Sequence, residues 1–74
     1  NPKTTITFTL PKQEDVSIKI YDLLGKDILA LVNEVRSAGV HTIYFDGSRL
    51  PSGIYICRIN TSSWSSSIKM TLQK

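Results

Sequence analysis

The sequence has few of the residues that usually stabilise or equip a small domain. It contains one cysteine, Cys57, so no disulfide bond can form within the chain. That thiol and a single histidine, His41, are too few soft ligands for a zinc site, and we expect no metal and no cofactor. A chain of 74 residues forms one domain at most, and such a domain buries only about 60% of the surface that its unfolded chain exposes. A thin apolar core must therefore stabilise the fold.

Clustered charge and long apolar runs are also missing. Nine basic and six acidic residues give a net charge of +3, and the basic residues are scattered along the chain. A nucleic-acid-binding domain presents a clustered basic stripe, so we expect no nucleic-acid partner. The longest apolar run, residues 28–32, is far too short to cross a bilayer. The chain begins at Asn1 without a charged and apolar leader, and we interpret it as a piece of a longer protein.

Alternating apolar residues are the strongest pattern that the sequence does contain. Successive side chains point to opposite faces of a strand, so a period of two indicates a half-buried strand. Five stretches show this period, at residues 4–10, 15–21, 40–46, 53–60 and 64–74. The alternate residues that share one face within each stretch are Ile6, Phe8, Leu10, Val16, Ile18, Ile20, Ile43, Phe45, Tyr55, Cys57, Ile59, Ile68, Met70 and Leu72.

A sixth stretch, residues 27–33, is less regular because its apolar residues occupy both faces. We interpret it as a strand buried on both sides, followed by a polar loop at residues 34–39. A seventh strand forms if the chain near Val35 pairs briefly. Turn signals separate these stretches about every 8–12 residues, a spacing typical of sandwiches. The sequence thus predicts an all-β fold, a β-sandwich of six to seven antiparallel strands, with residues 1–74 as its single domain.

The residues that could suggest catalysis or metal binding have simpler interpretations. His41 would need an orienting partner and a nucleophile within reach, and we place it on an outward strand face. Asp22 and Asp46 lie in turns before glycines, where aspartate usually accepts hydrogen bonds from its own backbone rather than binding calcium. Cys57 lies in mid-strand on the face expected to be buried, where a thiol is inert. We therefore predict no catalytic residue, no metal site and no enzyme activity.

The aromatic residues leave a second interpretation open. Tyr21, Tyr44, Tyr55 and Trp64 could stack against sugars or bases, although they come from separate stretches and Tyr55 is expected to face the core. Exposed aromatic residues are also common on sheets that bind nothing. A structural or carbohydrate-binding immunoglobulin-like accessory module is therefore the alternative function.

Four motifs follow one another along the chain. They are IYDLLGK at residues 20–26, SAGVHTIYFDG at 37–47, LPSGIY at 50–55 and IKMTL at 68–72. Their distinctive turn and aromatic residues are Tyr21, Asp22, Gly25, Gly39, Phe45, Asp46, Gly47, Pro51, Gly53 and Tyr55. This order, preceded by Asn1-Pro2, resembles the type A C-terminal sorting domain of the type IX (Por) secretion system, found on secreted proteins of Bacteroidetes. The chain departs from the family at Phe45, where tryptophan is frequent, and at Cys57, where an aromatic or aliphatic residue is usual.

The resemblance implies a non-catalytic sorting signal built on an immunoglobulin-like sandwich. In this family the secretion machinery of the outer membrane recognises the C-terminal end, here Lys69, Met70, Thr71, Leu72, Gln73 and Lys74. The implied partners are an N-terminally attached cargo domain, the translocon and shuttle proteins of the type IX system, and a sortase-like peptidase at the cell surface. The implied location is outside the cell or on its surface, after transit through the periplasm and the outer membrane. The pattern also resembles the immunoglobulin-like domain of the flagellar hook-capping protein, a fold relative without a sorting role.

Overall fold

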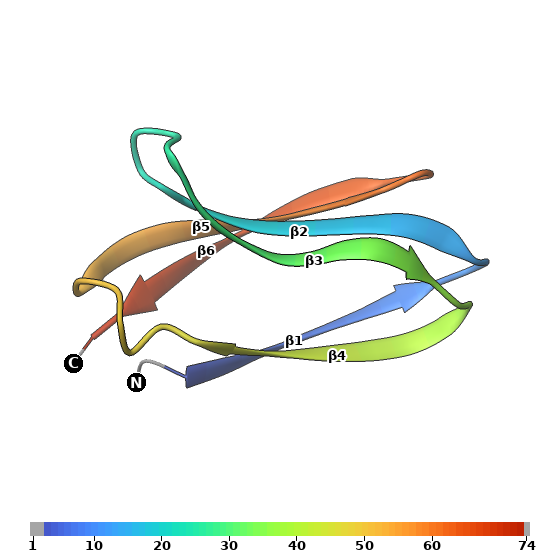
Figure 1. Ribbon diagram of the computed structural model, residues 1–74, viewed down its shortest axis with the longest axis horizontal. Coiled ribbons are helices and arrows are strands. Elements are labelled where there is room, and N and C mark those ends of the chain that lie inside the picture. Colours follow the sequence, from blue (N-terminus) through green and yellow to red (C-terminus); the bar gives the residue numbers. More distant parts are fainter. Residues whose placement is uncertain (1–2, 74) are drawn as a thin grey trace.

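The computed structural model describes residues 3–73, whose regular structure consists entirely of strands (Figure 1). The strands are β1 (Lys3–Leu10), β2 (Glu14–Asp22), β3 (Asp27–Arg36), β4 (Gly39–Asp46), β5 (Gly53–Thr61) and β6 (Ser65–Leu72). β1 pairs with β4 in a two-stranded sheet, and the other four strands form a sheet in the order β3-β2-β5-β6. All neighbouring strands are antiparallel. The predicted all-β sandwich is confirmed, with six strands in the described range.

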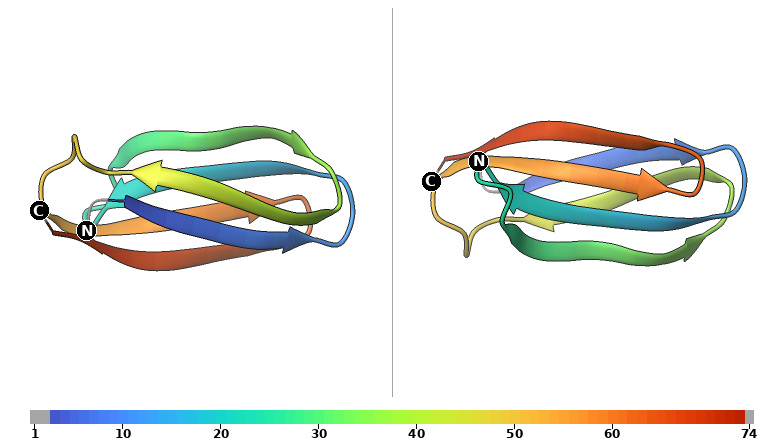
Figure 2. Two further views of the ribbon diagram at one scale, coloured as in Figure 1. Left: turned by 90° about the horizontal axis from the view of Figure 1, so that it is seen from below. Right: turned by 90° about the horizontal axis from the view of Figure 1, so that it is seen from above.

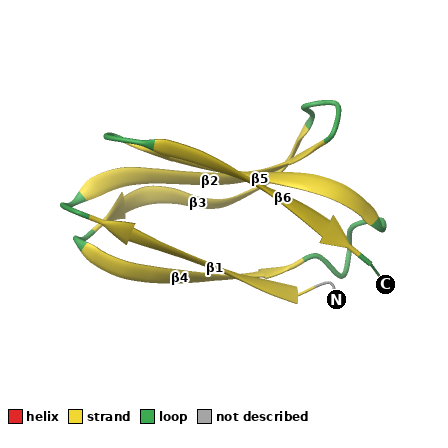
Figure 3. Cartoon of the chain, turned by 180° about the vertical axis from the view of Figure 1, so that it is seen from behind, coloured by secondary structure: helices red, strands yellow, loops and turns green. Residues whose placement is uncertain are grey.

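The two sheets lie face to face and enclose the core (Figures 1 and 3). Figure 2 shows the small sheet lying across the middle of the large one, with β3 and β6 at the two sides. The inward faces predicted for β1, β2 and β5 are confirmed, because their alternate apolar residues are buried. Residues 3–73 contain no helix that could cross a membrane. The core consists of Ile6, Phe8, Leu10, Val16, Ile18, Ile20, Val32, Phe45, Tyr55, Cys57, Ile59 and Leu72.

β3 differs from the prediction in length and in burial. The strand continues to Arg36, so Val35 is part of β3 and pairs with Asp15 of β2, and the described part of the chain forms no seventh strand. The loop expected at residues 34–39 is reduced to a short link before β4. Burial on both sides is also wrong, because Val32 is the only fully buried residue of β3. The reason is position: β3 is an edge strand and extends beyond the cover of the small sheet (Figure 2).

The irregular apolar pattern of β3 has a structural cause. The register between β2 and β3 shifts twice, once before Lys19 and once after Ile20. Leu31 and Ile28 of β3 are left without partners at these two points. At a β-bulge two residues of one strand oppose one residue of the other, so the alternation of side chains is interrupted. The two bulges explain why this stretch of the sequence does not alternate.

His41 faces inward, so the outward face predicted for it is wrong. Its position on β4 alternates with Ile43 and Phe45, which places all three side chains on the same face of the strand. The imidazole ring stacks on Phe8 with 5.5 Å between ring centroids. Its Nε2 atom donates a hydrogen bond to the carbonyl oxygen of Ser37, at 2.7 Å. The ring therefore closes one end of the core and ties the β3–β4 link to it.

Candidate functional site

β6 forms one edge of the large sheet and contains most of the predicted recognition segment. It pairs with β5, so that Leu72 lies opposite Gly53 and Met70 opposite Tyr55. Directly opposed residues of an antiparallel pair lie on the same face of the sheet. Met70 and Leu72 therefore point toward the small sheet together with Ile68, as their shared register predicted.

The burial of β6 increases toward its end. Ile68 is 44% exposed, Met70 is half-buried and Leu72 is fully buried. Figure 1 shows the reason: β6 starts at a hairpin far from the small sheet and ends beside the connection between β4 and β5. The buried side chain of Leu72 thus fixes the position of the end of β6.

The remaining residues of the recognition segment are exposed. Lys69 lies opposite Ile56 and Thr71 opposite Ile54, so both side chains are on the outer face of the large sheet. Gln73 follows the strand and is exposed. Lys74 lies outside the described residues. The structure therefore divides this segment into two inward anchors and an exposed outer row, and recognition of the segment stays a prediction.

The Asp-Gly motif after β4 packs against the end of β6. A Cβ atom at Gly47 would lie 2.6 Å from Cδ1 of Leu72 and 3.3 Å from Cζ of Phe45, so any larger residue there would displace the Leu72 side chain. Asp46 Oδ1 accepts a hydrogen bond from the backbone N–H of Ser48 at 2.9 Å, and this bond lowers the pKa of Asp46. The predicted use of Asp46 in its own turn is confirmed.

The LPSGIY motif holds the strand that pairs with β6. The hydroxyl of Tyr55 donates a hydrogen bond to the carbonyl oxygen of Pro51, at 2.7 Å, while its ring is buried in the core. A tyrosine bonded to the backbone a few residues upstream fixes the corner of many sandwiches. Gly53, with φ of 158°, begins β5 opposite Leu72. The rigid turn and the tyrosine together therefore set the register of β6.

The IYDLLGK motif forms the turn between β2 and β3. Oδ1 of Asp22 accepts backbone hydrogen bonds from Leu24 and Lys26, each at 2.9 Å, as predicted for an aspartate in a turn. Gly25 has φ of 85°, a backbone conformation that strains residues with a side chain. A second motif glycine, Gly39, begins β4 with φ of 124°. Both glycines thus adopt a positive φ that other residues rarely adopt.

Glu14 is a structural residue that the sequence interpretation missed. Its side chain is 3% exposed, and its Oε1 atom accepts hydrogen bonds from the backbone N–H of Ser63 at 2.9 Å and from its hydroxyl at 2.6 Å. These bonds attach the β5–β6 hairpin to the start of β2. The sequence did contain a signal for the burial of Glu14, because this residue lies in alternation with the buried Val16, Ile18 and Ile20.

The Glu14 contacts predict a pH-dependent stability. The hydroxyl of Ser63 is the main cause that holds the pKa of Glu14 below its ordinary value of 4.5. A carboxylate with a lowered pKa in the folded state stabilises the fold above the ordinary value, and this contribution is lost as the pH falls through the folded pKa. Urea unfolding should therefore show stability falling as the pH drops below about 4.5. Glu14→Gln should have a shallower acid slope, and an unchanged slope would contradict this role.

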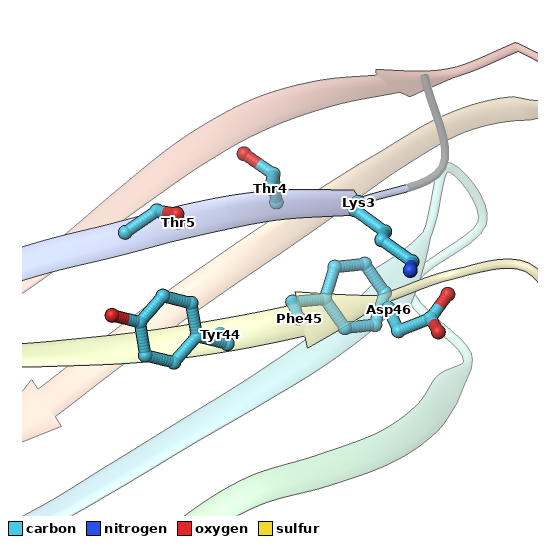
Figure 4. A pocket seen from close by; sticks show the side chains of 6 residues that line it. All are labelled: Lys3, Thr4, Thr5, Tyr44, Phe45 and Asp46. Carbon is cyan, nitrogen blue, oxygen red and sulfur yellow. The ribbon is translucent and has the colours of Figure 1, made fainter.

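The structure does not bring the four aromatic residues together. Tyr21 lies on the outer face of the large sheet, Tyr55 is buried, and Trp64 packs against the core from the β5–β6 hairpin. Tyr44 is 80% exposed on the outer face of the small sheet. Figure 4 shows it beside Thr5, in an open hollow of about 330 Å³ that is lined by Lys3, Thr4, Thr5, Tyr44, Phe45 and Asp46. A stacking platform of all four rings is therefore not formed.

The residues that could bind a metal or react as a nucleophile form no site in the described chain. Cys57 is buried in mid-strand as expected, and burial raises the pKa of its thiol, so the reactive thiolate is disfavoured. Residues 3–73 contain no group of three His, Cys, Asp or Glu side chains that could hold a metal ion.

The family described as the secretion system C-terminal sorting domain matches residues 1–73, nearly the whole chain. Neither the curated proteins nor the solved structures give a match. The family match covers the same turns and the same final strand that define the geometry above. The chain therefore belongs to the C-terminal sorting domains of the type IX secretion system, which mark attached proteins for secretion.

Proposed function

We propose that residues 1–74 form the single, non-catalytic sorting domain of a larger secreted protein. The domain directs an N-terminally attached cargo across the outer membrane, and the secretion machinery recognises it through β6 and the residues that follow. Membership of the sorting-domain family supports the export role. The geometry of β6 supports its part in recognition.

The regular edge of β6 is the observation that supports recognition through this strand. β6 pairs with β5 from Gly53 to Asn60 without a register shift, so its other side presents a regular strand edge. The opposite edge of the large sheet, β3, is interrupted by two bulges. An unbulged edge is a template for another strand, whereas bulges hinder such pairing. A protein of the secretion machinery can therefore add a strand along β6 and contact the exposed Lys69 and Thr71.

The partners follow from this role. The translocon and shuttle proteins of the type IX system bind the domain during transit from the periplasm through the outer membrane. A sortase-like peptidase at the cell surface then separates the domain from its cargo, which is released or anchored to the surface.

A reporter fusion tests the assignment. The 74-residue chain is fused to the C-terminus of a neutral reporter with a standard signal peptide, in a Bacteroidetes host. A strain without the secretion system and a reporter without the domain are the matched controls. We expect reporter in the medium or on the surface only when the domain and the system are both present. The mass of the exported reporter shows whether the domain has been removed.

Two results would overturn the proposal. Reporter retained in the periplasm of the intact strain would show that this chain does not direct export. Equal export in both strains would show that the type IX system is not the route.

A further inference from the structure

The turn between β2 and β3 exposes two leucine side chains in a rigid frame. Leu23 is 62% exposed and Leu24 is 95% exposed. The turn is fixed by the two hydrogen bonds to Oδ1 of Asp22 and by the backbone bond from Gly25 N–H to the Asp22 carbonyl, at 3.0 Å. Burying a leucine side chain is favourable, and contiguous exposed apolar surface often marks an interaction site. The turn holds Leu24 in solvent at a defined position.

An open hollow adjoins this turn on the outer face of the large sheet. Its volume is about 300 Å³, and it is lined by Tyr21, Asp22, Leu23, Gly25, Ile56, Arg58 and Ser67. These residues come from the turn and from β2, β5 and β6, which are adjacent strands. Tyr21 lies opposite Ile56, and Ile56 lies opposite Lys69. The hollow therefore joins the β2–β3 turn to the exposed row of β6.

The charges around the hollow are predominantly basic. Arg58, Lys69 and Lys26 have no ion-pair partner within residues 3–73, whereas Lys19 is paired with Asp27 at 3.3 Å. The carboxylate that lines the hollow, Asp22, already accepts hydrogen bonds from its own turn. An apolar surface with unpaired cations beside it is complementary to an apolar segment with negative charge.

We propose that this outer-face patch, made of Tyr21, Leu23, Leu24, Ile56, Arg58 and Lys69, binds an acidic segment of a protein of the export machinery. An apolar side chain of that segment enters the hollow, and its carboxylates contact Arg58 and Lys69. The inference rests on the proposed export function for the source of the partner. The concave shape favours a protein over a membrane, because a flat bilayer surface does not fill the hollow that Leu23 lines.

The patch also connects two motifs that lie far apart in the sequence. IYDLLGK contributes Tyr21 and the exposed leucines, and the final strand contributes Lys69. A partner that contacts both motifs therefore binds only when β2, β5 and β6 are folded against one another. The sequence of the final strand alone is not enough for such binding.

Export of the reporter fusion tests the patch in cells. The test variants are Leu23→Ser with Leu24→Ser, and Arg58→Glu alone. Their matched control is Val40→Ser with Tyr44→Ser, which changes two exposed residues on the outer face of the small sheet. We expect each test variant to reduce export about tenfold or more, the effect of truncating a binding hot spot, while the control exports normally. Thermal melts of the purified domains check that all variants remain folded.

The outcomes separate this inference from the proposed function. If the unaltered fusion is not exported, the export function itself fails. If the unaltered fusion is exported and the folded patch variants are exported equally well, the inference about the patch alone is overturned.

Binding by the purified chain tests the chemistry of the partner. The probe is a twelve-residue peptide that alternates glutamate with leucine, and the control peptide has lysine in place of glutamate. Amide chemical shifts should change at residues 21–26, 56–58 and 67–69 with the glutamate peptide alone, and Arg58→Glu should remove the effect. Equal shifts with both peptides would overturn the proposal. Binding to phosphatidylglycerol vesicles that depends on Leu24, without peptide binding, would assign the patch to a membrane instead.

Discussion

Replacing Phe45 with alanine should lower the free energy of unfolding by about 3–5 kcal/mol, the usual cost of truncating a buried phenylalanine. Phe45 is 2% exposed, and its ring adjoins Leu72 at the Gly47 turn. A domain of this size has a total stability of about 4–11 kcal/mol at 0.05–0.15 kcal/mol per residue. The cavity left by the ring therefore removes a large part of the stability, and it does so where β6 ends. Urea unfolding followed by the fluorescence of Trp64 measures the loss.

The neighbouring residue supplies the control. Tyr44 is an aromatic residue on the same strand, but it points to solvent. Tyr44→Ala should change the free energy of unfolding by no more than about 0.5 kcal/mol, as is usual for a surface substitution. A loss below about 1 kcal/mol for Phe45→Ala would show that the site collapses around the missing ring and that the core is less rigid than described.

Removing residues 69–74 should abolish export of the reporter fusion. The truncation has two effects, because it deletes the buried Leu72 together with the exposed Lys69 and Thr71. Leu72→Ala isolates the first effect and should cost about 2–5 kcal/mol of stability. Lys69→Glu with Thr71→Glu isolates the second, because both side chains lie on the outer face. Export assays and thermal melts on the same three variants distinguish unfolding from lost recognition.

The double variant is the decisive member of this series. It should melt within a few degrees of the unaltered domain, since surface changes rarely exceed about 0.5 kcal/mol. Its export should nevertheless fall about tenfold or more if the outer row of β6 contacts a partner. Normal export of this variant, with export lost only for Leu72→Ala, would mean that the machinery depends on the fold and not on these side chains.

Local alternation predicted the strands whose inward face is fully covered. Ile6, Phe8 and Leu10 follow a strict period of two and are buried, because the large sheet covers β1 along this stretch. The same reasoning placed Asp22 and Gly25 correctly, since a turn depends on its own few residues. The sequence pattern therefore predicts a strand correctly when the strand only has to bury one of its faces.

Other features depend on partners that a local pattern does not specify. Leu31 is unpaired because β3 has a bulge at this position, and the register between β2 and β3 is a property of both strands. Gly47 packs closely against Leu72, which lies 25 residues later in the chain and meets it only in the folded state. The order β3-β2-β5-β6 likewise needs long-range pairing. The candidate recognition residues were therefore identifiable by motif, whereas their division into anchors and an exposed row required the fold.

The pairing of distant strands also determines when this domain can fold. Lys3 of β1 lies opposite Asp46 of β4, and Val16 of β2 lies opposite Thr61 of β5. High contact order delays folding, because the entropy of closing long loops must be overcome before native contacts form, and folds of this type take milliseconds to seconds. β6 is the last strand of the sandwich to be synthesised, and Leu72 completes the core beside Gly47. A translation product that stops before β6 thus lacks both a complete core and the edge proposed for recognition, so we expect such a product not to be exported.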